Sequence, residues 1–308
     1  MGQATPRSPR YPARPARQSF QPRPHVILSS MLMSRTSWWR VLAPVAVGGA
    51  FLVLTALERR RPLRRVREAK WRHVSRNIVF AGAAAATVNL LERPVVEPLA
   101  NVVERRRCGL LYLCRLPRPL HIVLAIVLLD YTLYVWHVLT HRVSWLWRFH
   151  LVHHVDRDLD ASTALRFHAG ELALSIPWRA LQIAAIGVPL DALLLWQNML
   201  LLSILFHHSN VELPVDVERL VAHLVVTPRL HGIHHSIVPA ETNSNWSSGL
   251  TLWDYLHGTL RLDVPQQAIT IGVPAYPAPE DVTLANSFAL PFGAQRPWQV
   301  FPDDLSNH

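Results

Sequence analysis

Four apolar stretches limit this sequence to a helical membrane fold. They cover residues 38–57, 77–91 with a possible extension to 103, 120–139 and 172–206. A helix needs about 20 apolar residues to cross the hydrocarbon core of a bilayer. The last stretch is about 35 residues long, and Pro177 and the Gly187-Val188-Pro189 break predict a hairpin of two helices that returns to the same side. We therefore predict an all-α, integral-membrane bundle of about four to five helices.

Arginine beside the apolar stretches predicts how the helices are oriented. The chain has a formal net charge of +10, and its most basic short loop lies at residues 58–76. Positively charged loops remain in the cytoplasm, so we place this loop and, by counting spans, every histidine cluster on the cytoplasmic side. The basic N-terminal tail would then lie outside, a conflict that a start at Met31 or Met33 largely removes. The arginines form no stripe with aromatic residues, which argues against nucleic-acid binding.

The spacing of the histidines predicts metal binding. The chain has 17 histidines, and 12 of them lie between His137 and His235. Positions i, i+3 and i+4 share a helix face, so each cluster is expected to aim its imidazoles at one point. Eight clustered imidazoles exceed the ligands of one zinc ion and suit two metals that prefer nitrogen. The clustered residues are His137, His141, His150, His153, His154, His231, His234 and His235.

Other residues complete this prediction. Two further histidines, His168 and His208, would return to the same side of the membrane, and His208 is favoured over its neighbour His207. Thr227 before Pro228 predicts the start of the helix that carries the last cluster. Cys108 and Cys114 match no zinc or redox spacing, so cysteine would contribute no ligand.

These motifs resemble the fatty acid hydroxylase/sterol desaturase superfamily of integral-membrane, non-haem di-iron enzymes. HVLTH at 137–141 resembles the HxxxH box of that family, and HLVHH at 150–154 and HGIHH at 231–235 resemble its HxxHH boxes. TALRFHAGE at 163–171, FHHSN at 206–210 and ETNSNWSSGLTLWDYLHGT at 241–259 resemble three further motifs, so that the resemblance covers about residues 40–262. Departures that bear on pocket shape are Ala169-Gly170 after His168, Trp246-Ser247 in place of Tyr-Gly, and Gly232 in the last box.

The resemblance implies an iron- and O₂-dependent oxidoreductase that hydroxylates or desaturates a membrane lipid. The ten histidines named above would bind two irons beneath a cytosolic, His-rich helical cap. Since the sequence shows no fused redox module, a separate electron donor protein is expected. The implied domains are a disordered basic tail (1–36), an N-terminal transmembrane region (37–118), a fatty acid hydroxylase-like di-iron catalytic domain (119–264) and a loosely packed, Pro-rich tail (265–308).

Polar residues near the boxes are candidates for orienting the ligands. A metal-bound histidine usually donates its second N–H to a carboxylate or carbonyl group. Each candidate would otherwise cap a helix or a turn. Asp130 lies within the third apolar stretch, where an ionisable group is costly, and we expect it to pair with an Arg or a His. The candidates for orienting a ligand are Asp160, Glu171, Asn210, Asn243, Asn245 and Asp254.

Three other functions stay open at this point. A zinc-dependent membrane hydrolase would use the same clusters, although the sequence lacks an HExxH glutamate. A metal transporter would need ligands at mid-membrane, whereas these gather at one end of the apolar stretches. A catalytically inactive family member is the third alternative, and the intact boxes argue against it.

Overall fold

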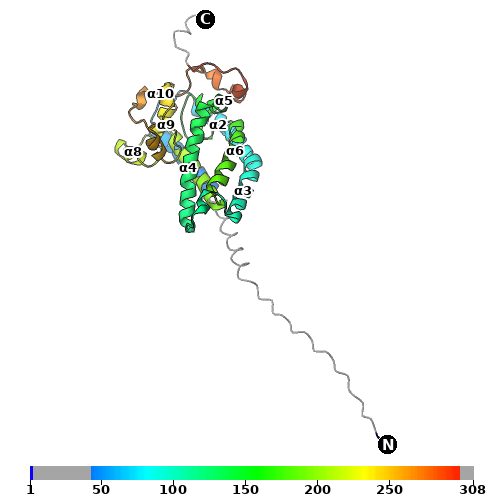
Figure 1. Ribbon diagram of the computed structural model, residues 1–308. Coiled ribbons are helices and arrows are strands. Elements are labelled where there is room, and N and C mark those ends of the chain that lie inside the picture. The colour runs from blue at the N-terminus through cyan, green and yellow to red at the C-terminus, as the bar shows by residue number, and fades with distance from the viewer. Residues whose placement is uncertain (3–42, 299–308) are drawn as a thin grey trace. The chain divides into compact units, whose positions relative to one another are not determined.

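The computed structural model describes residues 1–2 and 43–298, and these are folded into helices and connecting loops (Figure 1). Most of the predicted N-terminal tail, residues 38–42 of the first apolar stretch, and residues 299–308 lie outside the described part of the chain. The described part of the first stretch is helical from 43 to 60. Within the described ranges extended pairing is limited to isolated bridges, which confirms the prediction of an all-α fold.

The helices fall into a bundle and a cap that covers one end of it. The bundle elements are α2 (Lys70–Thr87), the π-helical turn η1 (Val88–Glu92), α3 (Arg93–Arg106), η2 (Leu110–Leu113), α4 (Arg118–Arg142), α6 (Ala169–Ile186) and α7 (Leu190–His208). The remaining elements are α5 (Ser144–His154), η3 (Thr163–Leu165), α8 (Val215–Ala222), α9 (Pro228–His234), α10 (Pro239–Thr242), α11 (Leu252–His257), η4 (Gln266–Ala268), η5 (Pro279–Val282), α12 (Leu284–Ala289) and η6 (Leu290–Phe292).

Three helical segments of the described chain are long and apolar enough to cross a membrane. They are Lys70–Leu113, Arg118–Arg142 and Leu190–His208. The first exceeds its predicted stretch because the chain remains helical from α2 through η1 into α3. The predicted hairpin is present as α6 and α7, but only α7 is apolar enough to be a candidate span. The four to five helices expected for the bundle included the hairpin pair and the first apolar stretch, which is described only in part.

The hairpin turns where the sequence predicts a break. Gly187 ends α6 with a left-handed backbone, at φ +87°, a conformation that glycine adopts without steric cost. A Cβ atom built on Gly109 would lie 2.4 Å from the Cα atom of Gly187, so the two loops meet backbone to backbone. His121 of α4 contacts the Gly187 carbonyl oxygen at 2.9 Å. This contact joins α4 to the turn between α6 and α7 at the end of the bundle opposite the cap, which we call the far end.

Apolar side chains of α3, α4, α6 and α7 fill the bundle. Its core includes Val96, Ala100, Leu129, Ile183 and Trp196, all nearly inaccessible to solvent. At the far end, Arg118 of α4 pairs with Asp191 of α7 at 2.7 Å. The two helices therefore run in the same direction, and their other ends, at His141 and His208, lie together at the cap.

The C-terminal region packs more firmly than predicted. Residues 265–298 were expected to form a loosely packed tail, but Val273, Ala275, Tyr276 and Val282 are buried against Leu151 of α5. Prolines in this region separate short helices and do not prevent burial. The packed region contacts α5, which carries three of the candidate ligands, and so supports that helix.

Candidate metal centre

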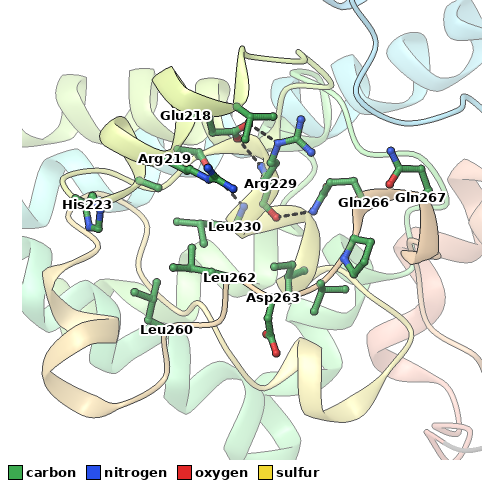
Figure 2. Close-up of a pocket in the computed structure, with 16 residues that line it drawn as sticks. Glu218, Arg219, His223, Arg229, Leu230, Leu260, Leu262, Asp263, Gln266 and Gln267 are labelled. Atoms are coloured by element: carbon green, nitrogen blue, oxygen red, sulfur yellow. Dashed lines mark hydrogen bonds and ion pairs between the residues drawn. The ribbon is translucent and has the colours of Figure 1, made fainter.

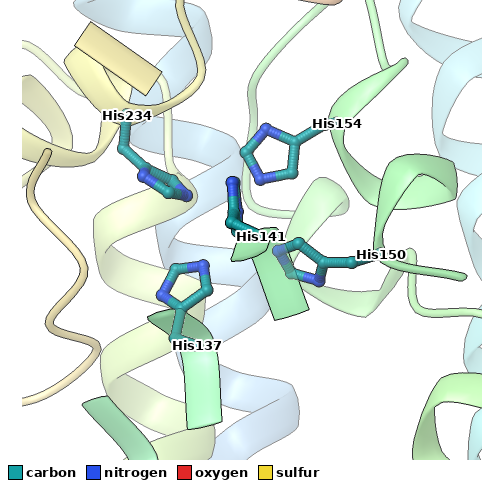
Figure 3. A group of neighbouring side chains, drawn as sticks. All are labelled: His137, His141, His150, His154 and His234. Atoms are coloured by element: carbon teal, nitrogen blue, oxygen red, sulfur yellow. The ribbon is translucent and has the colours of Figure 1, made fainter. Parts of the chain in front are cut away.

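Five histidines from three helices face one another in a first group (Figure 3). Each offers one ring nitrogen, and these nitrogens all lie within 4.8 Å of one another. Two residues come from the last turns of α4, two from α5 and one from α9. We call this set group one; its members are His137, His141, His150, His154 and His234.

Four more histidines form a second, adjoining group. The Nε2 atom of His208 lies 3.0 Å from that of His153 and 3.0 Å from that of His231. The Nε2 atom of His235 lies 3.1 Å from that of His231. We call His153, His208, His231 and His235 group two. The groups share a border, where the rings of His154 and His235 stack with their centroids 4.4 Å apart.

The grouping corrects the expectation that each box aims all of its imidazoles at one point. His150 and His154 belong to group one, but His153 belongs to group two; likewise His231 and His235 belong to group two and His234 to group one. A helix advances 100° per residue, so positions i and i+4 lie 40° apart while i+3 is turned 60° the other way. One HxxHH box therefore contributes to two neighbouring sites.

Hydrogen bonds at the second ring nitrogen set the tautomer of four ligands. In each case Nδ1 donates to an oxygen atom, which leaves the lone pair on Nε2 directed at the other histidines. The bonds run from His150 to the Glu171 carboxylate (2.9 Å), from His137 to the Trp246 carbonyl (2.7 Å), from His234 to the Ser244 carbonyl (2.9 Å) and from His208 to the Ile204 carbonyl (2.7 Å). This arrangement is usual for histidines that bind a metal ion.

Four of the five histidines of group one have an inward nitrogen without a hydrogen-bond partner. Nε2 of His141, His150 and His234 and both ring nitrogens of His154 are buried and unpaired. Burial, followed by the neighbouring imidazoles, lowers the pKa of His153 and His231, and burial lowers the pKa of His234 to about 3. The rings are therefore neutral near pH 7, and the unpaired lone pairs of group one are free to bind a cation. The residues fit two metal ions that accept imidazole nitrogen.

Sequence comparison relates this part of the chain to a known family. Residues 122–259 match the sequence profile described as fatty acid hydroxylase, a range that includes all nine histidines of the two groups. This part of the chain is similar to the fatty acid hydroxylase family. The resemblance expected from the motifs is thereby confirmed.

Characterised proteins of the fatty acid hydroxylase family match about half of the chain. An ornithine lipid hydroxylase of Rhizobium tropici is 34% identical over 161 residues, covering 51% of this chain and 46% of that protein. Human cholesterol 25-hydroxylase is 31% identical over 145 residues, covering 46% of this chain and 51% of that protein. Human alkylglycerol monooxygenase is 26% identical over 134 residues, covering 44% of this chain and 29% of that protein. The matched segment thus spans about half or less of these relatives, and no solved structure matches the chain significantly.

Two predicted or ambiguous histidines lie beside the groups. The Nδ1 atom of His168 accepts a hydrogen bond from the Gly170 N–H at 2.9 Å, and its ring lies among phenylalanine rings outside both groups. His168 is the N-cap of α6 and belongs to neither group. His207 is buried with its ring centroid 4.1 Å from that of His231, but His208 is the member of the pair in group two.

Of the residues predicted to orient ligands, Glu171 alone touches a histidine of either group through its own side chain. Asp254 acts one step further away, since its carboxylate accepts the N–H groups of Trp246 and Ser247 and so supports the carbonyl that His137 uses. The others bind elsewhere: Asp160 to His73 and Lys70, Asn210 to Arg64, Asn243 to the Pro239 carbonyl, and Asn245 to the Leu230 and Arg261 carbonyls.

Asp130 has partners other than those predicted. Its carboxylate accepts hydrogen bonds from the Trp253 indole at 2.7 Å and from the Leu250 N–H at 3.0 Å. Neutral donors thus replace the Arg or His that we expected. A Cβ atom on Gly249 would lie 2.2 Å from Asp130 Oδ1, so glycine is needed for this close approach. The bonds fasten the cap segment after Trp246 to the side of α4.

A buried ionic cluster beside α5 has no clear signal in the sequence. His73 contacts Asp160 through Nδ1 at 2.7 Å and Asp156 through Nε2 at 2.8 Å. Lys70 contacts Asp160 at 2.7 Å and Glu58 at 2.6 Å. The partners of His73 lie more than eighty positions away, so local spacing does not reveal them. The cluster ties the basic segment to the loop that follows His154.

Proposed function

We propose that this protein is an iron- and O₂-dependent hydroxylase of a membrane lipid, with one iron held by group one and one by group two. The observation that carries the proposal is the set of nine imidazoles, eight of them buried and His141 half-buried, several with the lone pair directed inward by a second hydrogen bond. A purely nitrogen-rich pair of sites without a carboxylate ligand suits iron in this family. The zinc hydrolases considered above would use a glutamate as the base, and neither group contains a carboxylate.

Iron reduced by a donor protein would supply the oxidising power that breaks an unactivated C–H bond, which side chains alone do not provide. The chain itself would hold the geometry. Glu171 and the carbonyls of Trp246, Ser244 and Ile204 would keep each ring in its orientation. The Trp246 ring, with its centroid 4.6 Å from that of His141, would exclude water from one side of group one. Trp246-Ser247 stands where the smaller pair Tyr-Gly is common in the family and would narrow the substrate space there.

A lipid substrate follows from the position of the groups. Both adjoin the ends of α4 and α7, two candidate membrane spans, so a lipid would reach them from the bilayer. The relatives named above are hydroxylases of an ornithine lipid and of cholesterol and a monooxygenase of alkylglycerol. Insertion of one oxygen atom is therefore favoured over desaturation for this chain as well.

The orientation of the protein and its electron supply are part of the proposal. The segment 58–76 remains the most basic short loop, and its position beside the cap would place the metal centre at the cytoplasmic face. Since the described chain is accounted for by the bundle and the cap, electrons would come from a separate protein that reaches this face.

Lipid analysis of a host with and without the protein tests the function. Cells grown under ¹⁸O₂ are expected to gain a lipid carrying one labelled oxygen atom, and purified protein is expected to contain iron. His153→Ala removes a ligand of group two and should abolish the product. His223→Ala is the matched control, because His223 is exposed and lies outside both groups.

Three results would count against the proposal. An equal amount of product from the His153→Ala host would exclude the centre as the catalyst. Product without ¹⁸O label would exclude oxygen insertion from O₂. An active, iron-free preparation containing zinc would favour the hydrolase alternative.

A further inference from the structure

Helix α8 turns its apolar side away from the protein. Val217, Leu220 and Leu224 follow at helical spacing and are 51%, 70% and 68% exposed. The opposite side carries Glu218, which is buried and accepts a hydrogen bond from Arg229 Nε at 2.5 Å (Figure 2). A surface helix in water normally shows the reverse arrangement, with the apolar stripe inside. The stripe is therefore expected to face a medium other than water.

Helix α11 continues the same apolar surface. Leu252, Tyr255 and Leu256 are 45%, 54% and 67% exposed, while Trp253 and Asp254 face inward. The Thr251 N–H donates to the Leu224 carbonyl at 3.2 Å, so the end of the α8 stripe and the start of α11 are joined through their backbones. We call this surface the α8–α11 patch; it consists of Val217, Leu220, Leu224, Leu252, Tyr255 and Leu256.

The contacts of α11 with α4 give the depth of the patch. Trp253 binds Asp130, and the Tyr134 hydroxyl lies 3.1 Å from Thr259 Oγ1. At 1.5 Å per residue, Asp130 and Tyr134 lie about 18 and 24 Å along α4 from Arg118, which pairs with Asp191 at the far end. The hydrocarbon core of a bilayer is about 30 Å thick. If Arg118 marks one face of the bilayer, α11 lies inside the opposite leaflet.

We propose that the α8–α11 patch is embedded in the lipid leaflet next to the metal centre and acts as an in-plane membrane anchor. The patch is continuous with the membrane-facing surface, because Ser203 of α7 donates to the Ser248 carbonyl at 2.6 Å and Met199 and Leu202, just below it, are exposed. Arg219, which is exposed at the polar side of α8, supplies a cation for lipid phosphate. Tyr255 is of a type enriched at membrane interfaces.

The anchor goes beyond the proposed function and does not depend on which metal the histidines hold. Its consequence is geometric. The first histidine of group one lies about 10 Å beyond the level of Asp130 on α4, since His137 is seven residues further along the helix. A lipid chain would then reach the centre along α11 without leaving the bilayer completely.

Spin labels on the full-length protein in phospholipid nanodiscs test the anchor. The exposed cysteines are first removed as Cys108→Ser and Cys114→Ser. Single cysteines are then introduced as Leu220→Cys and Leu256→Cys and labelled with a nitroxide. Asn243→Cys, just after α10, is the aqueous control, because its side chain is exposed and lies outside the patch. Val123→Cys, on the exposed side of α4, is the lipid control.

The measurement is the accessibility of each label to O₂, which concentrates in lipid, and to a water-soluble nickel chelate. The expected ratio of O₂ to nickel accessibility at positions 220 and 256 is several-fold higher than at 243 and close to that at 123. A ratio equal to that at 243 would overturn the anchor even where position 123 still reports lipid. Low accessibility to both reagents, with dipolar broadening between labels, would show that a second copy covers the patch and would also overturn it.

Discussion

Replacing Glu171 tests whether a carboxylate outside the ligand set strengthens the binding of one metal ion. Its Oε1 atom accepts the Nδ1–H of His150 at 2.9 Å, and the two side chains are 7% and 4% exposed. Charge-assisted hydrogen bonds are roughly twice as strong as neutral ones, and loss of such a partner lowers metal affinity about 10–100-fold. This range corresponds to about 1.4–2.8 kcal/mol. Glu171→Gln retains an acceptor oxygen and should weaken binding about 10-fold, while Glu171→Ala should approach 100-fold.

The assay is anaerobic titration of the metal-stripped, detergent-purified protein with Fe²⁺ against a competing chelator. Only the iron of group one should weaken, so one of the two binding steps is expected to change. Glu171 also lies in the first turn of α6, where a negative charge stabilises the helix by about 0.3–1 kcal/mol. Thermal unfolding of the metal-free protein measures that separate effect.

Asn243→Ala is the control for the Glu171 series. Asn243 was an equally good candidate from sequence, but its side chain is exposed and bonded to the Pro239 carbonyl. Its replacement should leave both binding steps unchanged. The reasoning is refuted if Glu171→Gln and Glu171→Ala bind both irons as tightly as the wild type.

Three further predictions follow from the placement of polar residues. His168→Ala should keep the full metal content, but loss of the N-cap should lower the free energy of unfolding by about 0.5–2 kcal/mol. His208→Ala should lose the metal of group two. Metal analysis and thermal unfolding check both variants, and metal loss in His168→Ala would contradict the first prediction. His73→Ala leaves Asp156 and Asp160 buried without their shared cation and should lower the free energy of unfolding by about 3–5 kcal/mol; a loss under about 1 kcal/mol would show that the cluster is only a surface-type pair. Burial raises the pKa of Asp160, but the hydrogen bond and charge of His73 outweigh it and lower that pKa. The stabilisation by this carboxylate is therefore complete above about pH 4 and is lost at lower pH. The difference in unfolding temperature between wild type and Asp160→Asn should shrink between pH 7 and pH 3, and a constant difference would contradict this.

Local spacing made the histidine clusters predictable. Imidazoles at positions i, i+3 and i+4 can be recognised from their spacing as lying on one side of a helix. Thr227-Pro228 correctly predicted the start of α9. The hairpin break was equally local, because Gly187 ends a helix and Pro189 begins the next. The extent of the second span was not predictable, since the π-helical turn η1 keeps α2 and α3 joined through a weakly apolar segment.

The sequence by itself determined that this chain is helical, with apolar segments long enough to cross a membrane and enough clustered imidazole for two metal ions, because apolar length and helical spacing act over a few residues. Only the tertiary structure decided how nine of those imidazoles divide into two groups, which carbonyls orient them, and why His168 caps a helix. The pairing of Glu218 with Arg229 also directs the polar side of α8 toward the protein and leaves its apolar side exposed. These outcomes depend on contacts between distant segments and on backbone atoms, which every residue carries and which therefore leave no signature in the order of side chains.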